Sequence, residues 1–122
     1  MPQRKLPNYV RASRKKAGLS QDDLALLLGC GSGTKVSRYE RFRRQPGLAT
    51  VFALEAIFGT PARELFAGIY ADAEQQTLDR ARALIRQLSE HRDRPHVQRK
   101  LDRLRTIVGD LPGNDDANPS PR

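Results

Sequence analysis

The chain has 122 residues, of which 38% are hydrophobic and 30% are charged, with one cysteine and two histidines. This is enough for one small domain with an appendage, and a single cysteine excludes an internal disulfide framework. No apolar run approaches a membrane span, the first residues lack the apolar stretch of a signal peptide, and no Cys or His has metal-ligand spacing. We therefore expect a cytoplasmic protein without membrane contact, cofactor or metal.

The formal net charge of +8 is concentrated in the N-terminal half of the chain. Residues 1–68 contain 12 Lys and Arg against 5 Asp and Glu, whereas residues 69–122 contain 10 against 9. An excess of cations favours binding to nucleic-acid phosphates, although basic runs such as residues 14–16 are also common on solvated surfaces.

Two short helices are predicted first, over about 8–17 and 21–28. Gly18 and Gly29 follow them, and glycine in the left-handed conformation commonly ends a helix. Ser20 and Asp23 have the spacing of a capping box at the start of the second helix. Its buried stripe is expected at three leucines with i, i+3, i+4 spacing, namely Leu24, Leu27 and Leu28.

A third helix is predicted over about 34–42, after a glycine-rich turn that contains Cys30. That cysteine is either a small turn residue or an oxidation sensor. Val36 and Tyr39 share one face of the third helix, and the remaining surface is polar or cationic. Side chains of that kind hydrogen-bond to base edges and phosphates, so this helix is suited to a groove of DNA. The outward residues are Thr34, Lys35, Ser37, Arg38 and Arg41.

Two further helices complete the predicted N-terminal domain, over about 48–58 and from Pro61 to near Phe66. Thr60 is the expected N-cap of the second of these. No segment alternates as a strand does, so the domain is expected to be all-α. The apolar side of the helix over 48–58 is expected to comprise Leu48, Val51, Phe52, Leu54 and Phe58.

These residues resemble the lambda-repressor-like (Xre/Cro-type) helix-turn-helix family over about residues 8–68. The matching segments are VRASRKKAGLSQDDLALLLG, KVSRYERFRRQP and LATVFALEAIFGTPARELF. The turn CGSG is about one residue longer than usual, Ser13 replaces a common core leucine, and Glu55 replaces a common alanine. The resemblance implies a five-helix domain that binds double-stranded DNA in a sequence-specific manner, usually as a two-fold dimer. Glu55 is then either exposed or paired with an arginine.

The resemblance also assigns roles to residues. Gln21 is expected to contact a phosphate and to brace the first residue of the third helix, the alternative being a plain polar first-turn residue. Arg38 is the strongest candidate for reading a base, its alternative being a phosphate contact. Arg14 and Glu40 correspond to a structural salt bridge. The full sets are Thr34, Lys35 and Arg38 for base reading, and Gln21, Ser37, Arg41, Arg43 and Arg44 for phosphates.

The C-terminal half is predicted to form two helices, about 71–92 and 95–110, before a disordered tail over 112–122. Apolar residues at steps of 3 and 4 form two narrow stripes that cannot make a core alone. Residues 69–111 are therefore expected to be a hairpin that dimerises the protein or, alternatively, packs on its own domain. The dimerisation residues are expected to be Leu78, Ile85, Leu88, Val97, Leu101, Leu104 and Val108, with Ala81 and Leu111 in the same stripes.

The sequence thus predicts a transcriptional regulator, expected to be a repressor that reads an inverted-repeat operator as a homodimer. The alternative is an antitoxin or anti-activator whose C-terminal helices bind another protein. An enzyme is not expected, because no nucleophile–base pair, paired carboxylates, metal cluster or phosphate-loop motif is present in the sequence. No catalytic residue is therefore predicted.

Overall fold

A computed structural model of the chain describes residues 5–109, and all of its regular elements in that range are helical. The all-α class expected from the sequence is confirmed. The chain divides into two compact units, and the boundary between them falls after Asp72, within a long helix. Leu111 and the tail 112–122, predicted to be disordered, lie outside the described residues.

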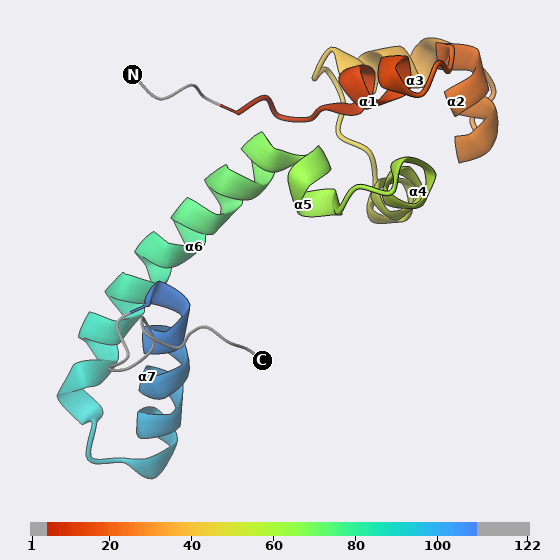
Figure 1. The fold of residues 1–122 in the computed structure, drawn as a ribbon. Coiled ribbons are helices and arrows are strands. Elements are labelled where there is room, and N and C mark those ends of the chain that lie inside the picture. The colour runs from red at the N-terminus through yellow and green to blue at the C-terminus, as the bar shows by residue number, and fades with distance from the viewer. Residues whose placement is uncertain (1–4, 110–122) are drawn as a thin grey trace. The chain divides into compact units, whose positions relative to one another are not determined.

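Helices α1 to α5 belong to the first unit (Figure 1). The first helix begins at Val10, two residues later than expected, because Asn8 caps it from outside. The Asn8 side chain accepts a hydrogen bond from Val10 N–H and donates one to Tyr39 O, both at 3.0 Å. Gly18 and Gly29 have the left-handed conformation expected at helix ends. The bounds are α1 Val10–Lys16, α2 Gln21–Leu28, α3 Gly33–Glu40, α4 Leu48–Phe58 and α5 Ala62–Leu65.

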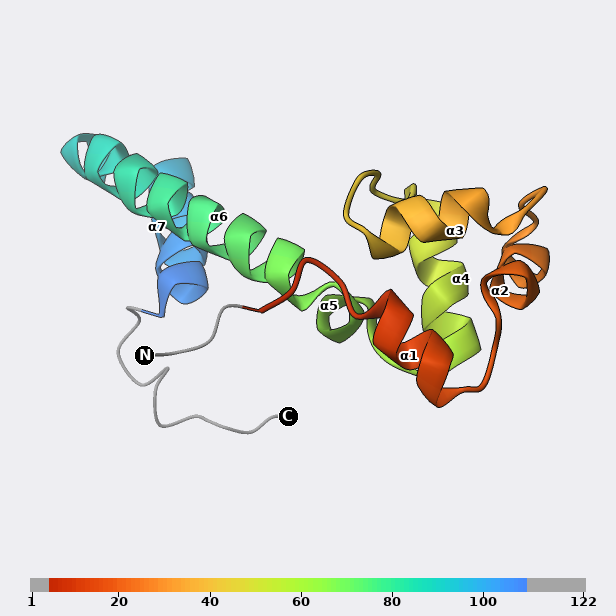
Figure 2. The ribbon, with the colours of Figure 1, turned by 90° about the horizontal axis from the view of Figure 1, so that it is seen from above.

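One core joins the first four helices, because α4 contacts α1 and α2, and α3 contacts the same two helices (Figure 2). The predicted burial of Leu27 is wrong: this residue is 56% exposed, and Ala25 is buried beside Leu24 instead. On α4, Leu48 and Phe52 are exposed, because the helix is apolar on several sides and only part of it meets other helices. The buried core residues are Val10, Leu24, Ala25, Val36, Leu54, Leu65 and Phe66.

The start of α5 is capped by a residue of α4. Glu55 Oε1 accepts a hydrogen bond from Ala62 N–H at 3.1 Å, which satisfies a free donor of the helix terminus. Thr60, the predicted N-cap, instead bonds through its hydroxyl to Phe58 O at 3.4 Å. Among residues 5–109, Glu55 is therefore neither a free surface residue nor an ion-pair partner, and the prediction of a Thr60 cap is wrong.

The N-terminal segment before α1 is held against the end of α5 and the start of α6. Tyr9 N–H donates to Leu65 O at 2.8 Å, and Gly68 N–H donates to Leu6 O at 2.8 Å. The approach at Gly68 is so close that a Cβ there would overlap Leu6 O and lie 2.8 Å from Lys5 O. Only glycine fits this position without movement of the backbone.

We expect Gly68→Ala to lower the free energy of unfolding by about 1–3 kcal/mol, the range typical of overpacking. Urea denaturation followed by circular dichroism measures this change. Gly31→Ala is the matched control, because a Cβ at Gly31 meets nothing within 4 Å. Equal stability of the two variants would contradict the close approach at Gly68.

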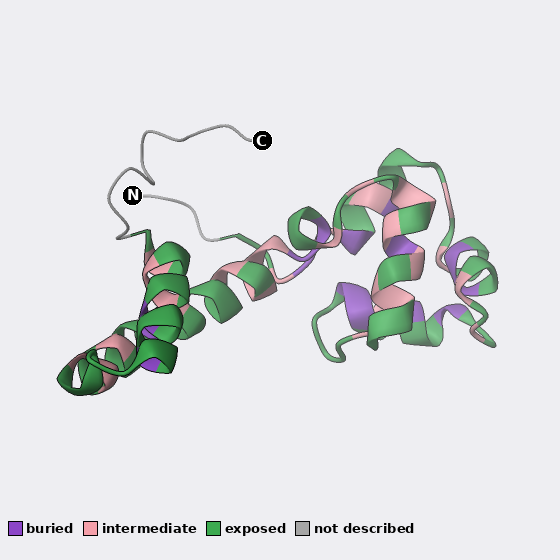
Figure 3. Ribbon diagram, turned by 90° about the horizontal axis from the view of Figure 1, so that it is seen from below, coloured by how far each residue is buried: buried purple, intermediate pink, exposed green. Residues whose placement is uncertain are grey.

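The second unit contains the later part of α6 (Ala67–Leu88), a 3-10 turn at Ser89–His91, and α7 (Pro95–Val108). In Figure 1, α7 runs back beside the second half of α6, so the predicted hairpin is present. The expected apolar stripes line its inner side, where buried residues appear in Figure 3. Ala81, Val97 and Leu101 are buried, and half-buried neighbours complete the stripes at Leu78, Ile85, Leu88, Leu104 and Val108.

Candidate nucleic-acid interface

Helices α2 and α3 are joined by a tight turn, and local hydrogen bonds define the start of each. Ser20 Oγ accepts from Asp23 N–H and the Asp23 carboxylate accepts from Ser20 N–H, both at 2.9 Å, so the predicted capping box is confirmed. These bonds from Ser20 hold the pKa of the Asp23 carboxyl below its ordinary value. Ser32 caps α3 through Thr34 N–H at 3.4 Å. Cys30 in the turn is half-buried and packs against the core.

The two faces of α3 differ in the way the sequence predicts. Val36 and Tyr39 are buried, which fixes the rotation of the helix against the core. The base-reading candidates Thr34, Lys35 and Arg38 are all exposed. The longer turn therefore leaves these three side chains free to contact another molecule.

The contact between α2 and the start of α3 corrects one expectation. Gln21 does not brace the first residue of α3; Asp22 Oδ1 does so, by accepting from Gly33 N–H at 3.0 Å. Gln21 Nε2 instead donates to Glu40 Oε1 at 3.1 Å. A primary amide has two N–H donors, so one donor of Gln21 remains for a phosphate oxygen. A Cβ on Gly33 would lie 2.8 Å from Asp22 Oδ1, so this end of α3 accepts only a small residue.

A buried ion pair joins α1 to the last residue of α3. Arg14 Nε lies 2.6 Å from Glu40 Oε2, Arg14 Nη2 lies 3.1 Å from Glu40 Oε1, and the two side chains are 10% and 2% exposed. Arg14 Nη1 also donates to Leu19 O at 2.9 Å. The hydrogen bond to Glu40 raises the pKa of the Arg14 guanidinium. Together with Gln21, this pair connects α1, α2 and α3 at one point, and the salt bridge expected from the family resemblance is present.

Helix α3 ends at Glu40, two residues earlier than predicted, in a Schellman motif. Phe42 N–H donates to Tyr39 O at 3.1 Å, and Arg43 N–H donates to Arg38 O at 2.9 Å. Glycine is the usual residue at the left-handed position of this motif, but here it is Phe42, with φ 62°. Phe42 is the one described residue other than glycine with positive φ, so the chain leaves α3 through a strained residue.

We expect Phe42→Gly to be more stable than Phe42→Ala by about 1 kcal/mol, because both variants lose the ring and only glycine relieves the left-handed strain. Thermal unfolding of the two variants measures the difference. In a helix interior alanine would be the more stable residue, so the reversed order is diagnostic. An alanine variant at least as stable as the glycine variant would show that no strain is stored at this position.

The predicted phosphate-contacting residues separate into two groups. Gln21, Ser37 and Arg41 line one shallow hollow of about 370 Å³ together with Thr34. Ser37 Oγ accepts hydrogen bonds from Arg41 Nε and Nη2 at 3.1 and 2.8 Å, which leaves the hydroxyl hydrogen of Ser37 available for a phosphate. Arg43 and Arg44 lie in the loop after α3, outside this group.

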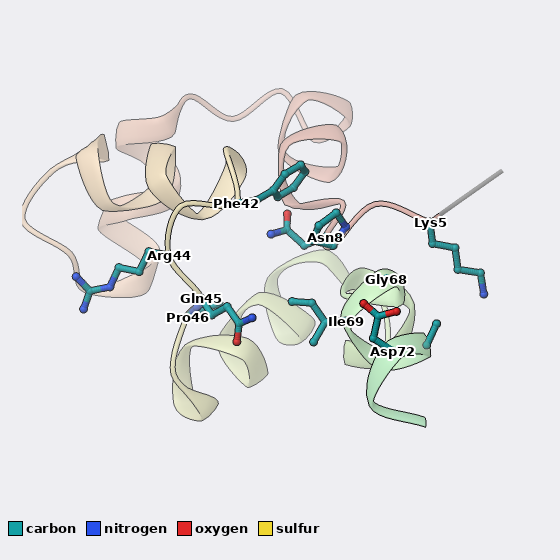
Figure 4. A pocket seen from close by; sticks show the side chains of 11 residues that line it. Lys5, Asn8, Phe42, Arg44, Gln45, Pro46, Gly68, Ile69 and Asp72 are labelled. Atoms are coloured by element: carbon teal, nitrogen blue, oxygen red, sulfur yellow. The ribbon is translucent and has the colours of Figure 1, made fainter. Parts of the chain in front are cut away.

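Arg44 lines a larger hollow of about 640 Å³ between the N-terminal segment, the loop after α3 and the start of α6 (Figure 4).

Among the described residues, no group of three or more His, Cys, Asp or Glu is placed to hold a metal ion. None of the helices within residues 5–109 combines the length and apolar character needed to cross a membrane.

A capped helix, a glycine-containing turn and an exposed cationic helix fixed by a buried face define a DNA-binding helix-turn-helix domain. Residues 10–65, from α1 to α5, match the family model described as Helix-turn-helix, and this domain belongs to the Xre/lambda-repressor-like helix-turn-helix family. This match supports a DNA-binding transcription regulator. Comparison with curated proteins and with solved structures found no match.

Proposed function

We propose that the protein is a repressor that binds an inverted-repeat operator as a homodimer, with α3 in the major groove of each half-site. The observation that carries this proposal is the outward face of α3, where Thr34, Lys35 and Arg38 are exposed while Val36 and Tyr39 are buried. Arginine binds guanine O6 and N7 with two hydrogen bonds, lysine reaches the same atoms, and threonine contacts a thymine methyl or a polar edge.

Phosphate contacts position this helix in the groove. The hollow beside α3 brings the free N–H of Gln21, the Ser37 hydroxyl and the Arg41 guanidinium to the same side as Thr34. Arg43 and Arg44 are exposed in the following loop and extend the cationic surface beyond the hollow. Such contacts set the register of the protein on the duplex without specifying sequence.

The second unit is proposed to hold two chains together. Val97 and Leu101 are buried inside the hairpin, so they stabilise it and do not contact a second chain directly. The surface proposed to contact the second chain comprises the half-buried residues of the two apolar stripes. It also includes Leu84 and Ile107, which are 39% and 40% exposed. Leu84 lies four residues before Leu88 and Ile107 lies three after Leu104, so both extend the stripes on one side. A two-fold dimer places recognition helices about 34 Å apart on successive major grooves.

Selection of bound duplexes from a random pool tests the proposal, because it requires no assumption about the operator sequence. We expect an enriched inverted repeat, and fluorescence anisotropy should give binding to it about a thousandfold tighter than to a shuffled duplex. Light scattering at tens of micromolar should give the mass of two chains. A pool without enrichment would contradict sequence-specific reading, and a monomer would contradict the dimer.

A second candidate rests on the same exposed Leu84 and Ile107. An antitoxin or anti-activator would use these residues to bind an unrelated protein, and DNA binding would then be secondary. A monomer that forms a one-to-one complex with a co-purified partner through the hairpin would favour this function over the homodimer.

A further inference from the structure

The described part of the second unit is itself basic. Residues 73–109 contain nine Lys and Arg against five Asp and Glu, a formal net charge of +4. The near-neutral balance of residues 69–122 arises because four of its nine acidic residues lie outside the range 73–109 in the sequence, at Asp72, Asp110, Asp115 and Asp116. The excess positive charge of the protein is therefore not confined to the helix-turn-helix domain.

Three of these cations occupy the outer side of α7. Arg99, Lys100 and Arg103 are exposed, and they alternate with Val97 and Leu101, which face the interior of the hairpin. Arg99 and Arg103 are four residues apart and thus lie on the same helical face, about 6 Å apart along the axis at 1.5 Å per residue. Asp102 is the one acidic residue of α7, and α7 carries four cations against it.

No ion pair within the described part of the chain accounts for this cationic face. The ion pairs found within residues 5–109 are Arg14–Glu40 and Arg82–Asp79, so none of the three cations is neutralised by a carboxylate in the described structure. Like charges at i, i+4 are unfavourable for an isolated helix. Within residues 5–109 no ion pair offsets this repulsion, whereas a bound polyanion would relieve it.

We propose that Arg99, Lys100 and Arg103 bind phosphates of the DNA backbone outside the base pairs that α3 reads. This inference rests on the proposed function, because it takes DNA as the polyanion. The hairpin is covalently continuous with the DNA-binding domain through α6, so binding of the domain raises the local concentration of phosphate around α7. Guanidinium groups pair with phosphate oxygens through two hydrogen bonds, which suits a helix with two arginines on one face.

The test is the salt dependence of binding to duplex DNA by the full chain. The variant Arg99→Gln with Lys100→Gln and Arg103→Gln removes the face, and the matched control Arg80→Gln with Arg86→Gln and Arg92→Gln removes the same charge from other exposed positions of the unit. We expect the slope of log K against log[salt] to weaken by about 0.9 for each lost phosphate contact, hence by about 2 to 3 per chain and about 5 for the proposed homodimer. The control should keep a slope close to that of the unmodified protein.

Phosphate contacts carry no sequence information, so the preference for the selected duplex over a shuffled one should be unchanged in the α7 variant. An unchanged slope, or an equal loss in the control, would overturn the inference. The inference would also be overturned if the α7 variant lost binding to phosphatidylserine vesicles while its salt slope for DNA was unchanged. The face would then bind a membrane surface instead of DNA. If the unmodified protein does not discriminate between duplexes, the proposed operator reading fails, but the slope comparison remains valid because it can be measured on either duplex.

Discussion

Glu40→Ala is expected to lower the free energy of unfolding by about 3 kcal/mol, because it leaves the Arg14 guanidinium buried without its carboxylate. The melting temperature of a domain of this size should then fall by roughly 12–24 °C, since 1 kcal/mol shifts it by about 4–8 °C. Gln21 loses its acceptor as well. Loss of DNA binding in this variant should therefore follow the loss of folded protein, as measured by circular dichroism at each temperature.

Glu64→Ala is the matched control, because it removes the same charge from an exposed position of α5. A second comparison separates the value of the pair from the cost of breaking it. Arg14→Met combined with Glu40→Leu removes both charges and should recover part of the stability that Glu40→Ala loses. A Glu40→Ala protein that melts with the unmodified one but binds a different sequence would assign Glu40 to recognition rather than to folding.

Arg38→Ala should lower discrimination between the selected and a shuffled duplex by about 1–3 kcal/mol for each half-site, which corresponds to roughly five- to 150-fold per half-site. The side chain is exposed, and the backbone carbonyl that accepts from Arg43 N–H is unchanged by the substitution. Stability should therefore stay near that of the unmodified protein. Anisotropy titrations of both duplexes at one fixed salt concentration measure the effect.

Arg43→Ala provides the comparison, because loss of a phosphate contact should weaken binding to both duplexes equally and reduce the salt slope by about 0.9 per chain. If Arg38→Ala behaves in that same way, Arg38 contacts a phosphate and base reading falls to Thr34 and Lys35. The two substitutions thus distinguish the two roles that the sequence leaves open for Arg38.

Features set by local chemistry could be predicted from the sequence. The limits of α2 and α4 follow from caps and glycines next to them, and the capping box at Ser20 depends only on two residues three apart. The burial of Val36 and Tyr39 follows from helical spacing alone. The Arg14–Glu40 pair, 26 positions apart, was accessible only through resemblance to a family, because no local rule joins residues at that distance.

Features set by tertiary contacts were missed, each for an identifiable reason. Helical spacing does not decide whether Leu27 or Ala25 of α2 faces the core. Leu27 is three residues after Leu24 and Ala25 is next to it, so both lie near the face on which Leu24 is buried. The cap that Glu55 provides crosses from one helix to the next. Phenylalanine carries no signal for the left-handed conformation, so the sequence did not indicate that α3 ends at Glu40, before a left-handed Phe42.

The buried contacts of Glu40 with Arg14 and Gln21 have a consequence for how such a regulator could change the operator that it binds. The residues that hold α3 in place are buried and bonded to one another, whereas Thr34, Lys35 and Arg38 point to solvent. Substitutions at these three positions should therefore preserve the fold, and under the proposed function they would change which base edges α3 contacts. A lineage could drift to a new operator through stable intermediates, but each new operator would be read from the same fixed rotation of the helix.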